Sequence, residues 1–142
     1  MSALQNMGEP RIKIVAMPKD TNPSGNIFGG WIMSNIDIAG ALATRDLPIE
    51  NVVTVKVNSM VFREPIFVGD VVSYYAKIVK VGNTSIKVEV EVNAERLYDG
   101  ARRCVHVTSA DITYVSVDID GKKKSINCSK NYLLALGIEN NE

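Results

Sequence analysis

The sequence contains few of the residues on which several classes of protein depend. Its 142 residues include one histidine and two cysteines, and 16 basic residues balance 16 acidic ones. A general nucleic-acid binder normally has a basic excess, so zero net charge argues against that class. Cys104 and Cys128 are too few for a disulfide framework or a zinc site. With His106 as the only histidine, one chain cannot supply a mechanism that needs two.

Long apolar runs are also missing. No run approaches the roughly 20 residues of a membrane span, and residues 1–11 lack the apolar core of a signal peptide. We therefore expect a cytoplasmic protein that binds neither membranes nor nucleic acid. Hydrophobic residues make up 46% of the chain and charged residues 23%. Together with the chain length, this composition indicates one globular domain with a core of its own.

The spacing of apolar and turn-forming residues predicts one helix among five strands. A short strand over residues 11–17 precedes a loop rich in Pro, Gly and Asn over residues 18–26. A helix is expected over residues 31–46, because Pro48 disfavours its continuation. Four further strands are predicted over residues 52–62, 71–81, 85–97 and 102–117. One helix and one antiparallel sheet make an α+β fold, in which the helix is buried against the concave face of a curved sheet.

Two details refine this arrangement. The strand over residues 85–97 alternates cleanly between apolar and charged residues, which predicts one buried and one wet face. In the strand over residues 102–117 the parity of the apolar positions switches, which predicts a β-bulge near Ser109. Residues 1–124 are expected to form the domain, and residues 125–142 a C-terminal tail with a short helix around residues 132–136.

The predicted helix is apolar on all sides. Between residues 31 and 43 the only polar side chains are Ser34, Asn35 and Asp37. A helix of this kind is buried on most sides, yet a single sheet covers only one of them. We therefore expect the other side to be covered by a second copy of the chain, in a dimer or a larger assembly.

Asp37 lies in the middle of this helix, with Met33, Gly40 and Ala41 one turn away. A buried carboxylate without a partner is costly. One interpretation is a structural aspartate that is bonded to backbone or to an Arg or Lys. The other is a catalytic carboxylate in a groove, where the small neighbouring residues leave room for a ligand.

The segment Phe28-Gly29-Gly30 precedes the apolar stretch. Free N–H groups at a helix start attract negative charge, and glycine allows a carbonyl to approach closely, which together favour an oxyanion site. The alternative is that the glycines only permit a tight turn. Gly30 and Asp37 are about 10 Å apart along a helix, too far for both to contact one carbonyl. If both are catalytic, Gly30 of one chain should act with Asp37 of another, which gives a two-fold dimer two equivalent sites.

Long segments of the chain then match a known family. They are residues 16–22, 25–37, 53–55 with Met60, 62–65 with Gly69 and Asp70, 82–85, and 114–118 with Gly121 and Lys122. These segments resemble the YciA-type acyl-CoA thioesterases, a family of hotdog-fold acyl-CoA hydrolases. The likeness covers about residues 10–124.

The resemblance implies a hotdog fold, in which a curved antiparallel sheet of five to six strands wraps a long central helix. It implies a dimer with a continuous sheet, often assembled as a trimer of dimers. It also implies hydrolysis of acyl-CoA to free CoA and a carboxylic acid. No metal and no cofactor are expected, since CoA is part of the substrate and of the product.

The resemblance further implies roles for particular residues. Asp37 matches the catalytic carboxylate of the family, and Asn22 matches an asparagine that assists from the other subunit. A hydroxyl residue on the next strand is also implicated, for which Thr54 is the best match by spacing and Ser59 a weaker one. We expect Gly30, with Gly29, to hold the thioester carbonyl. Whether Asp37 acts as a general base or as a nucleophile stays open.

Further residues are candidates for substrate binding. Phe28 and Met33 lie beside the predicted centre, and Ile36, Met60 and Phe62 are expected to line the acyl groove with Met33. Arg63 and Lys122 are the first candidates for the phosphates of CoA, ahead of Arg102, Arg103, Lys123 and Lys124. Thr84 and Ser85 either contact the pantetheine arm or close a hairpin.

Three other hypotheses are weighed against hydrolysis. The same fold could bind acyl-CoA without turnover, as a sensor, although binding alone would not need Asp37 and Asn22 together. A hydratase would normally pair the acid with a histidine, and His106 is far from the helix in sequence. Cys104 and His106 share a strand face, but no third group to orient them is evident. The acyl chain length, the physiological substrate, feedback by CoA and the role of the tail are not determined by the sequence.

Overall fold

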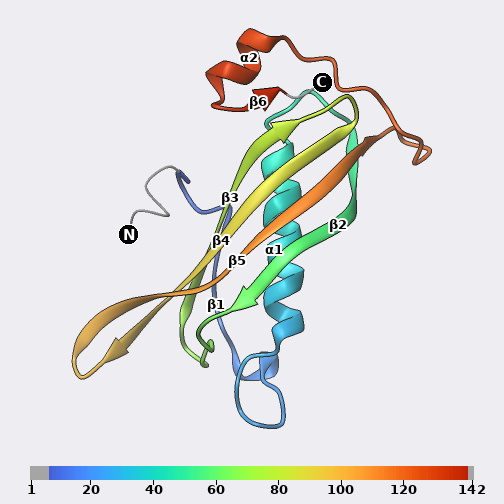
Figure 1. Ribbon diagram of the computed structural model, residues 1–142. Helices are drawn as coiled ribbons and strands as arrows, with labels where there is room; N and C mark the ends of the chain where they lie inside the picture. Colours follow the sequence, from blue (N-terminus) through green and yellow to red (C-terminus); the bar gives the residue numbers. More distant parts are fainter. Residues whose placement is uncertain (1–6, 141–142) are drawn as a thin grey trace.

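A curved sheet that wraps one long helix makes up most of the computed structural model, which describes residues 7–140 (Figure 1). The strand order is β1-β3-β4-β5-β2, with antiparallel neighbours throughout, and β6 pairs with β3 in parallel. The elements are β1 (Ile12–Val15), the 3₁₀-helix η2 (Pro18–Asp20), α1 (Gly29–Thr44), β2 (Asn51–Phe62), β3 (Val71–Val81), β4 (Ser85–Tyr98), β5 (Ala101–Val117), α2 (Lys130–Ala135) and β6 (Glu139–Asn140).

The α+β hotdog arrangement that the sequence predicts is confirmed. The four long strands, β2 to β5, lie within one residue of their predicted bounds. Helix α1 begins two residues earlier than predicted and ends two residues earlier. Its end is set by tight turns, in which the N–H groups of Arg45, Asp46 and Leu47 each bond to a carbonyl three residues back. Strand β6 was not foreseen, because two residues carry no periodic pattern.

Strand β4 forms the centre of the hydrophobic core. Its alternate side chains Ile86, Val88, Val90, Val92 and Ala94 are fully buried, as the alternation predicts. They face the buried side of α1, which includes Ile32, Ile36 and Ala39. Because each buried aliphatic side chain contributes on the order of 1.5–3 kcal/mol, this layer fixes the position of the helix on the sheet.

A β-bulge in β5 produces the predicted change of parity. Val92 pairs with Thr108 and the next residue, Asn93, pairs with His106, so Val107 is the extra residue. Both Val107 and Thr108 are fully buried. The bulge therefore lies two residues before Ser109, since Ser109 already follows the new parity.

Helix α1 is covered on one side only. Opposite its buried side, Met33, Ile38 and Leu42 are exposed. Strand β2 lies at the end of the sheet, with β5 as its only partner in the described chain, and its valines at 53, 55 and 57 are exposed as well. A long, apolar edge strand beside an apolar helix face is unusual for a chain that works alone.

The C-terminal segment crosses the upper end of the helix (Figure 1). Ser129 caps α2 by accepting a bond from the N–H of Tyr132, which sets the helix start two residues before the expected range. The Tyr132 hydroxyl donates to the main-chain oxygen of Asp46 at 2.8 Å, and Leu133 and Ile138 join the core. The domain boundary at residue 124 stays a prediction.

The packing of α2 can be tested with two neighbouring leucines. Leu133 is 2% exposed and Leu134 is 71% exposed. We expect Leu133→Ala to lower the free energy of unfolding by about 2–5 kcal/mol, because it leaves a cavity in the core. Leu134→Ala is the matched control and should change it by less than about 0.5 kcal/mol. Urea denaturation of both variants measures the difference, and equal values would show that the tail does not belong to the core.

Candidate active site

Two hydroxyl groups hold the Asp37 carboxylate halfway along α1. Thr54 Oγ1 donates to Asp37 Oδ1 at 2.7 Å. The Tyr114 hydroxyl lies 3.2 Å from the same oxygen and donates to the main-chain oxygen of Asp37 at 2.7 Å. Thr54 and Tyr114 are direct cross-strand partners on β2 and β5, so the sheet register delivers both donors to one place.

Asp37 is half-buried and has no ion-pair partner among residues 7–140. The structural interpretation of this residue allowed a salt link to Arg or Lys. The part of the chain that the structure describes contains no such link. Hydroxyl donors stabilise a carboxylate without neutralising it. The side chain can thus still accept a proton or attack a carbon.

Tyr114 keeps its proton in this environment. Burial raises the pKa of its phenol well above the usual value, and the nearby negative charge of Asp37 raises it further. The hydroxyl is therefore a permanent donor at neutral and mildly alkaline pH. Because an unfolded tyrosine ionises at a pKa of about 10, this group makes the fold less stable as the pH rises above that value.

Gly40 does not leave room for a ligand, as one of the two interpretations of Asp37 supposed. The Tyr114 ring fills the space beside it. A Cβ at Gly40 would lie 3.0 Å from Cζ of that ring and still closer to the hydroxyl oxygen. The glycine thus allows the phenol to approach the helix backbone.

The start of α1 is open. The first helical backbone bond runs from the N–H of Ile32 to the carbonyl of Phe28, so the N–H groups of Gly29 and Gly30 precede the helical ladder. Neither glycine has a positive φ, and a Cβ on either would meet nothing within 4 Å. A tight turn does not explain these glycines, and the space beside them is open.

The loop that joins η2 to α1 lies beneath the helix start (Figure 1), and Asn22 belongs to this loop. Its Oδ1 accepts bonds from the N–H groups of Ser24 and Asn26, at 3.0 and 3.1 Å. The oxygen therefore organises the loop, while no group in residues 7–140 accepts from Nδ2. Asn22 and Gly30 thus lie at one end of α1 and Asp37 lies about 10 Å further along it.

Thr54, and not Ser59, is the hydroxyl residue of β2 that the structure brings to Asp37. Ser59 lies five positions further along the strand, within an irregular stretch between Asn58 and Val61. It is exposed and its φ is 41°, in the left-handed region.

An open cleft of about 400 Å³ lies between the second half of α1 and the start of β2, and neither Asp37 nor Thr54 lines it. Ala41, one turn after Asp37, and Val52, two positions before Thr54, both line it. The remaining walls are Ile38, Leu42, Thr44, Arg45, Ile49, Glu50 and Asn51. Met33 is exposed one turn before Asp37, whereas Ile36 is fully buried in the core and cannot line a groove.

The residues predicted to bind CoA are divided between two ends of the sheet. Arg63 Nη1 lies 3.3 Å from Ser109 Oγ, near the β5 bulge. From Ser109, β5 runs about 26 Å further before the turn that holds Lys122. Thr84 and Ser85 belong to that same far end, where the Thr84 carbonyl bonds to β5. One chain therefore does not bring Arg63 and Lys122 to the same phosphate.

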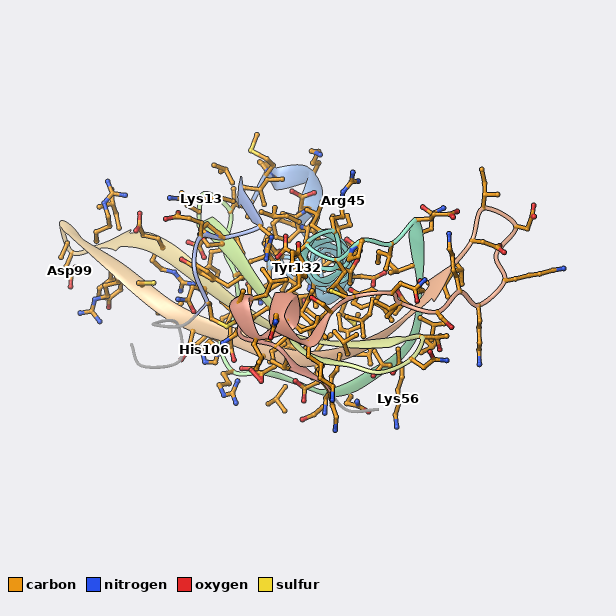
Figure 2. All side chains as sticks on the ribbon, turned by 90° about the horizontal axis from the view of Figure 1, so that it is seen from above. Lys13, Arg45, Lys56, Asp99, His106 and Tyr132 are labelled. Carbon is orange, nitrogen blue, oxygen red and sulfur yellow. The ribbon has the colours of Figure 1, made fainter. Side chains whose placement is uncertain are left out.

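His106 belongs to a polar cluster on the outer face of the sheet, to one side of the helix (Figure 2). Its Nε2 lies 2.6 Å from Glu91 Oε2 and 3.1 Å from Ser109 Oγ, and Ser109 donates to the same Glu91 oxygen at 2.7 Å. A catalytic relay needs the two ring nitrogens to face different partners, and here one nitrogen meets both. Cys104 is exposed and makes no such contact. Glu91 belongs to the face of β4 that the alternation predicts to be wet, and it is instead held in this cluster.

Two observations limit the kinds of site present. Within residues 7–140, no group of three or more His, Cys, Asp or Glu side chains is placed to hold a metal ion. In the same part of the chain, no helix has the length and apolar character needed to cross a membrane.

A wrapped helix with a carboxylate at its middle and open amides at its start defines a hotdog-fold protein with a candidate hydrolytic site. Residues 24–101 match the thioesterase superfamily. The acyl-CoA thioester hydrolase YciA of Salmonella typhimurium is 43% identical over 131 residues, which is 89% of this chain and 97% of that protein.

Solved structures agree. Cj0915, a hexameric hotdog fold thioesterase of Campylobacter jejuni, is 57% identical with a TM-score of 0.86, over 94% of this chain and 99% of that one. HI0827, a hexameric broad specificity acyl-coenzyme A thioesterase solved as an Asp-to-Ala mutant, is 41% identical with a TM-score of 0.83, over 91% and 94%. The chain belongs to the thioesterase superfamily and, within it, to the YciA-type acyl-CoA thioester hydrolases.

The fit between Gly40 and Tyr114 gives a test by substitution. Gly40→Ala should lower the free energy of unfolding by about 1–3 kcal/mol, because the added methyl group overpacks the site. Gly29→Ala is the control, since its added methyl group meets open space and alanine favours a helix. Thermal denaturation compares the two. A Gly40→Ala variant as stable as Gly29→Ala would contradict the close approach of the phenol.

Proposed function

We propose that this enzyme hydrolyses acyl-CoA thioesters to free CoA and a carboxylic acid, with Asp37 as the acting carboxylate. The observation that carries the proposal is a carboxylate fixed by two hydroxyl donors, without a cationic partner in the described chain, near a cleft lined by both apolar and polar side chains. Its relatives, the YciA protein and HI0827, are named as acyl-CoA thioesterases. The Asp-to-Ala form of HI0827 also points to an aspartate of interest in that protein.

In the proposed reaction, an oxygen atom attacks the thioester carbon and the carbon–sulfur bond breaks. If water attacks, Asp37 takes its proton and passes it to the departing thiolate. If Asp37 attacks, it forms an anhydride that water then hydrolyses. The backbone N–H of Gly30, with that of Gly29, stabilises the oxyanion. Because a thiolate is a good leaving group, the reaction needs neither a histidine acid nor a cofactor.

We place the two halves of the site on two chains. Gly30 and Asp37 of one chain are too far apart to contact one thioester carbon, which needs both within about 6 Å of each other. Asn22 lies at the Gly30 end, so it comes from the same chain as Gly30, with Nδ2 free to orient water. Thr54 comes with Asp37, whose Oδ1 it holds.

The assembly that we propose is a dimer in which the exposed sides of α1 and β2 are covered and the sheet continues across β2. Two such chains make two equivalent sites. The relatives Cj0915 and HI0827 are hexameric, and three dimers make a hexamer. Phosphate contacts from Arg63 and Lys122 then come from different chains, since one chain holds them apart. A hydratase is disfavoured, because His106 is bonded to Glu91 on the outer face.

Replacement of the carboxylate tests the chemistry. Asp37→Asn should lower the rate of free thiol release from a panel of acyl-CoAs by at least about 100-fold, since a positioned base contributes about that much. Asp111→Asn, on the outer face of β5, is the matched control and should release thiol at the wild-type rate. Undiminished release by Asp37→Asn would remove this residue from the mechanism. Binding of acyl-CoA by the wild type without any thiol release would favour the sensor hypothesis.

Mixed assemblies test whether two chains build each site. Gly30→Pro removes one backbone N–H, and proline is tolerated in the first helical turn. Gly30→Pro and Asp37→Asn homo-oligomers should both be inactive. Dimers formed from one chain of each type contain one site with both groups intact, so refolding the variants together should restore about a quarter of the wild-type thiol release. Refolding that forms mixed dimers without restoring activity would place both groups in one chain.

A further inference from the structure

We propose that Tyr114 is the positioning residue of this site, whose hydroxyl holds the Asp37 carboxylate and the helix turn beneath it in a single geometry. The inference rests on the proposed function, in which Asp37 acts on the thioester. From the sequence, Tyr114 fits the buried parity of β5 and is expected only to belong to the core.

The phenol contacts two oxygen atoms of Asp37. Its hydroxyl donates to the main-chain oxygen of Asp37 and lies 3.2 Å from Oδ1. In a regular α-helix, the carbonyl of residue 37 also accepts the N–H of residue 41. The hydroxyl therefore contacts both the carboxylate and the helical carbonyl of the same residue.

Burial, strand pairing and the approach to Gly40 together fix the position of the phenol. Tyr114 is 0% exposed, and it pairs with Ile86 on β4 and Thr54 on β2. Gly40 allows the ring to approach the helix backbone, where any side chain would collide with it. A rotation of α1 would break these contacts, so the tyrosine ties the orientation of Asp37 to the sheet.

The two hydroxyl groups contact only one of the two carboxylate oxygens of Asp37. Thr54 and Tyr114 both face Oδ1, and no donor within residues 7–140 faces Oδ2. Oδ1 is thereby anchored and Oδ2 is left to take a proton from water or to attack carbon. A hydroxyl carries only one proton, so Tyr114 divides it between the main-chain oxygen and Oδ1, while Thr54 donates to Oδ1 alone.

A second buried tyrosine provides a matched comparison. Tyr74 on β3 is also 0% exposed and also packs against α1. Its hydroxyl accepts a bond from Asn35 Nδ2 at 3.3 Å and does not contact Asp37. Burial raises the pKa of both phenols, so both are buried hydroxyl groups on the sheet that differ in their hydrogen-bond partners.

The experiment compares Tyr114→Phe with Tyr74→Phe in the full-length oligomer, by thiol release from acyl-CoA over a range of pH. Tyr114→Phe should lower kcat roughly 10- to 100-fold, because the carboxylate loses its fixed position. The acidic limb of its pH–rate profile should move up by about one pH unit, because a donor to the ionised carboxylate is lost. KM should change little. Tyr74→Phe should keep the wild-type kcat and the wild-type acidic limb.

A purely structural role predicts another pattern. In that case both variants would melt earlier while kcat and the acidic limb stay at wild-type values, and the inference would be overturned. Gly40→Ala displaces the phenol without deleting it, and should move the acidic limb in the same direction as Tyr114→Phe. Wild-type kcat in Asp37→Asn would overturn the proposed function instead. Loss of activity in Asp37→Asn with a wild-type profile in Tyr114→Phe would overturn this inference alone.

Discussion

The structure depends on the fact that one sheet can cover only one side of a helix. Helix α1 buries Ile32, Ile36 and Ala39 against β4 and leaves Met33 and Ile38 uncovered. Burial on the sheet contributes to the stability of the chain, and the uncovered side is the surface that the second copy covers in the proposed dimer. The same helix holds the carboxylate and the open amides on which the proposed chemistry relies. The same apolar helix therefore belongs to the core, to the proposed dimer interface and to the proposed site.

Strand register connects the core to the site. Because Thr54 and Tyr114 are paired across β2 and β5, a slip of β2 by one residue along β5 would turn Thr54 to the other face of the sheet, away from Asp37. The orientation of Tyr114 is fixed in turn by the pairing of β5 with the buried strand β4. The geometry around Asp37 is thus specified by aliphatic packing, with the polar contacts as its outcome.

Much of this arrangement could be predicted from the sequence, for physical reasons. The alternation in β4 and the apolar stretch of α1 are local periodic signals, so the strands, the helix and the choice of Asp37 followed from them. Thr54 could be chosen only because its spacing matches a hydroxyl residue of the family that the sequence resembles. Tyr114 and Gly40 could not be recognised, because their contact joins residues far apart in the chain and each fits a simpler role alone. The bonding of Glu91 to His106 likewise depends on pairing between strands, which no single strand reveals.

Strand β2 serves two purposes that are usually separate. One side of it carries Thr54 toward the carboxylate, and its outer edge is open to another strand. A substitution that weakens this edge therefore also disturbs Thr54, the residue that holds the carboxylate of the proposed site. If the proposed dimer and site hold, a short extended peptide designed to pair with this edge should inhibit the enzyme without resembling the substrate.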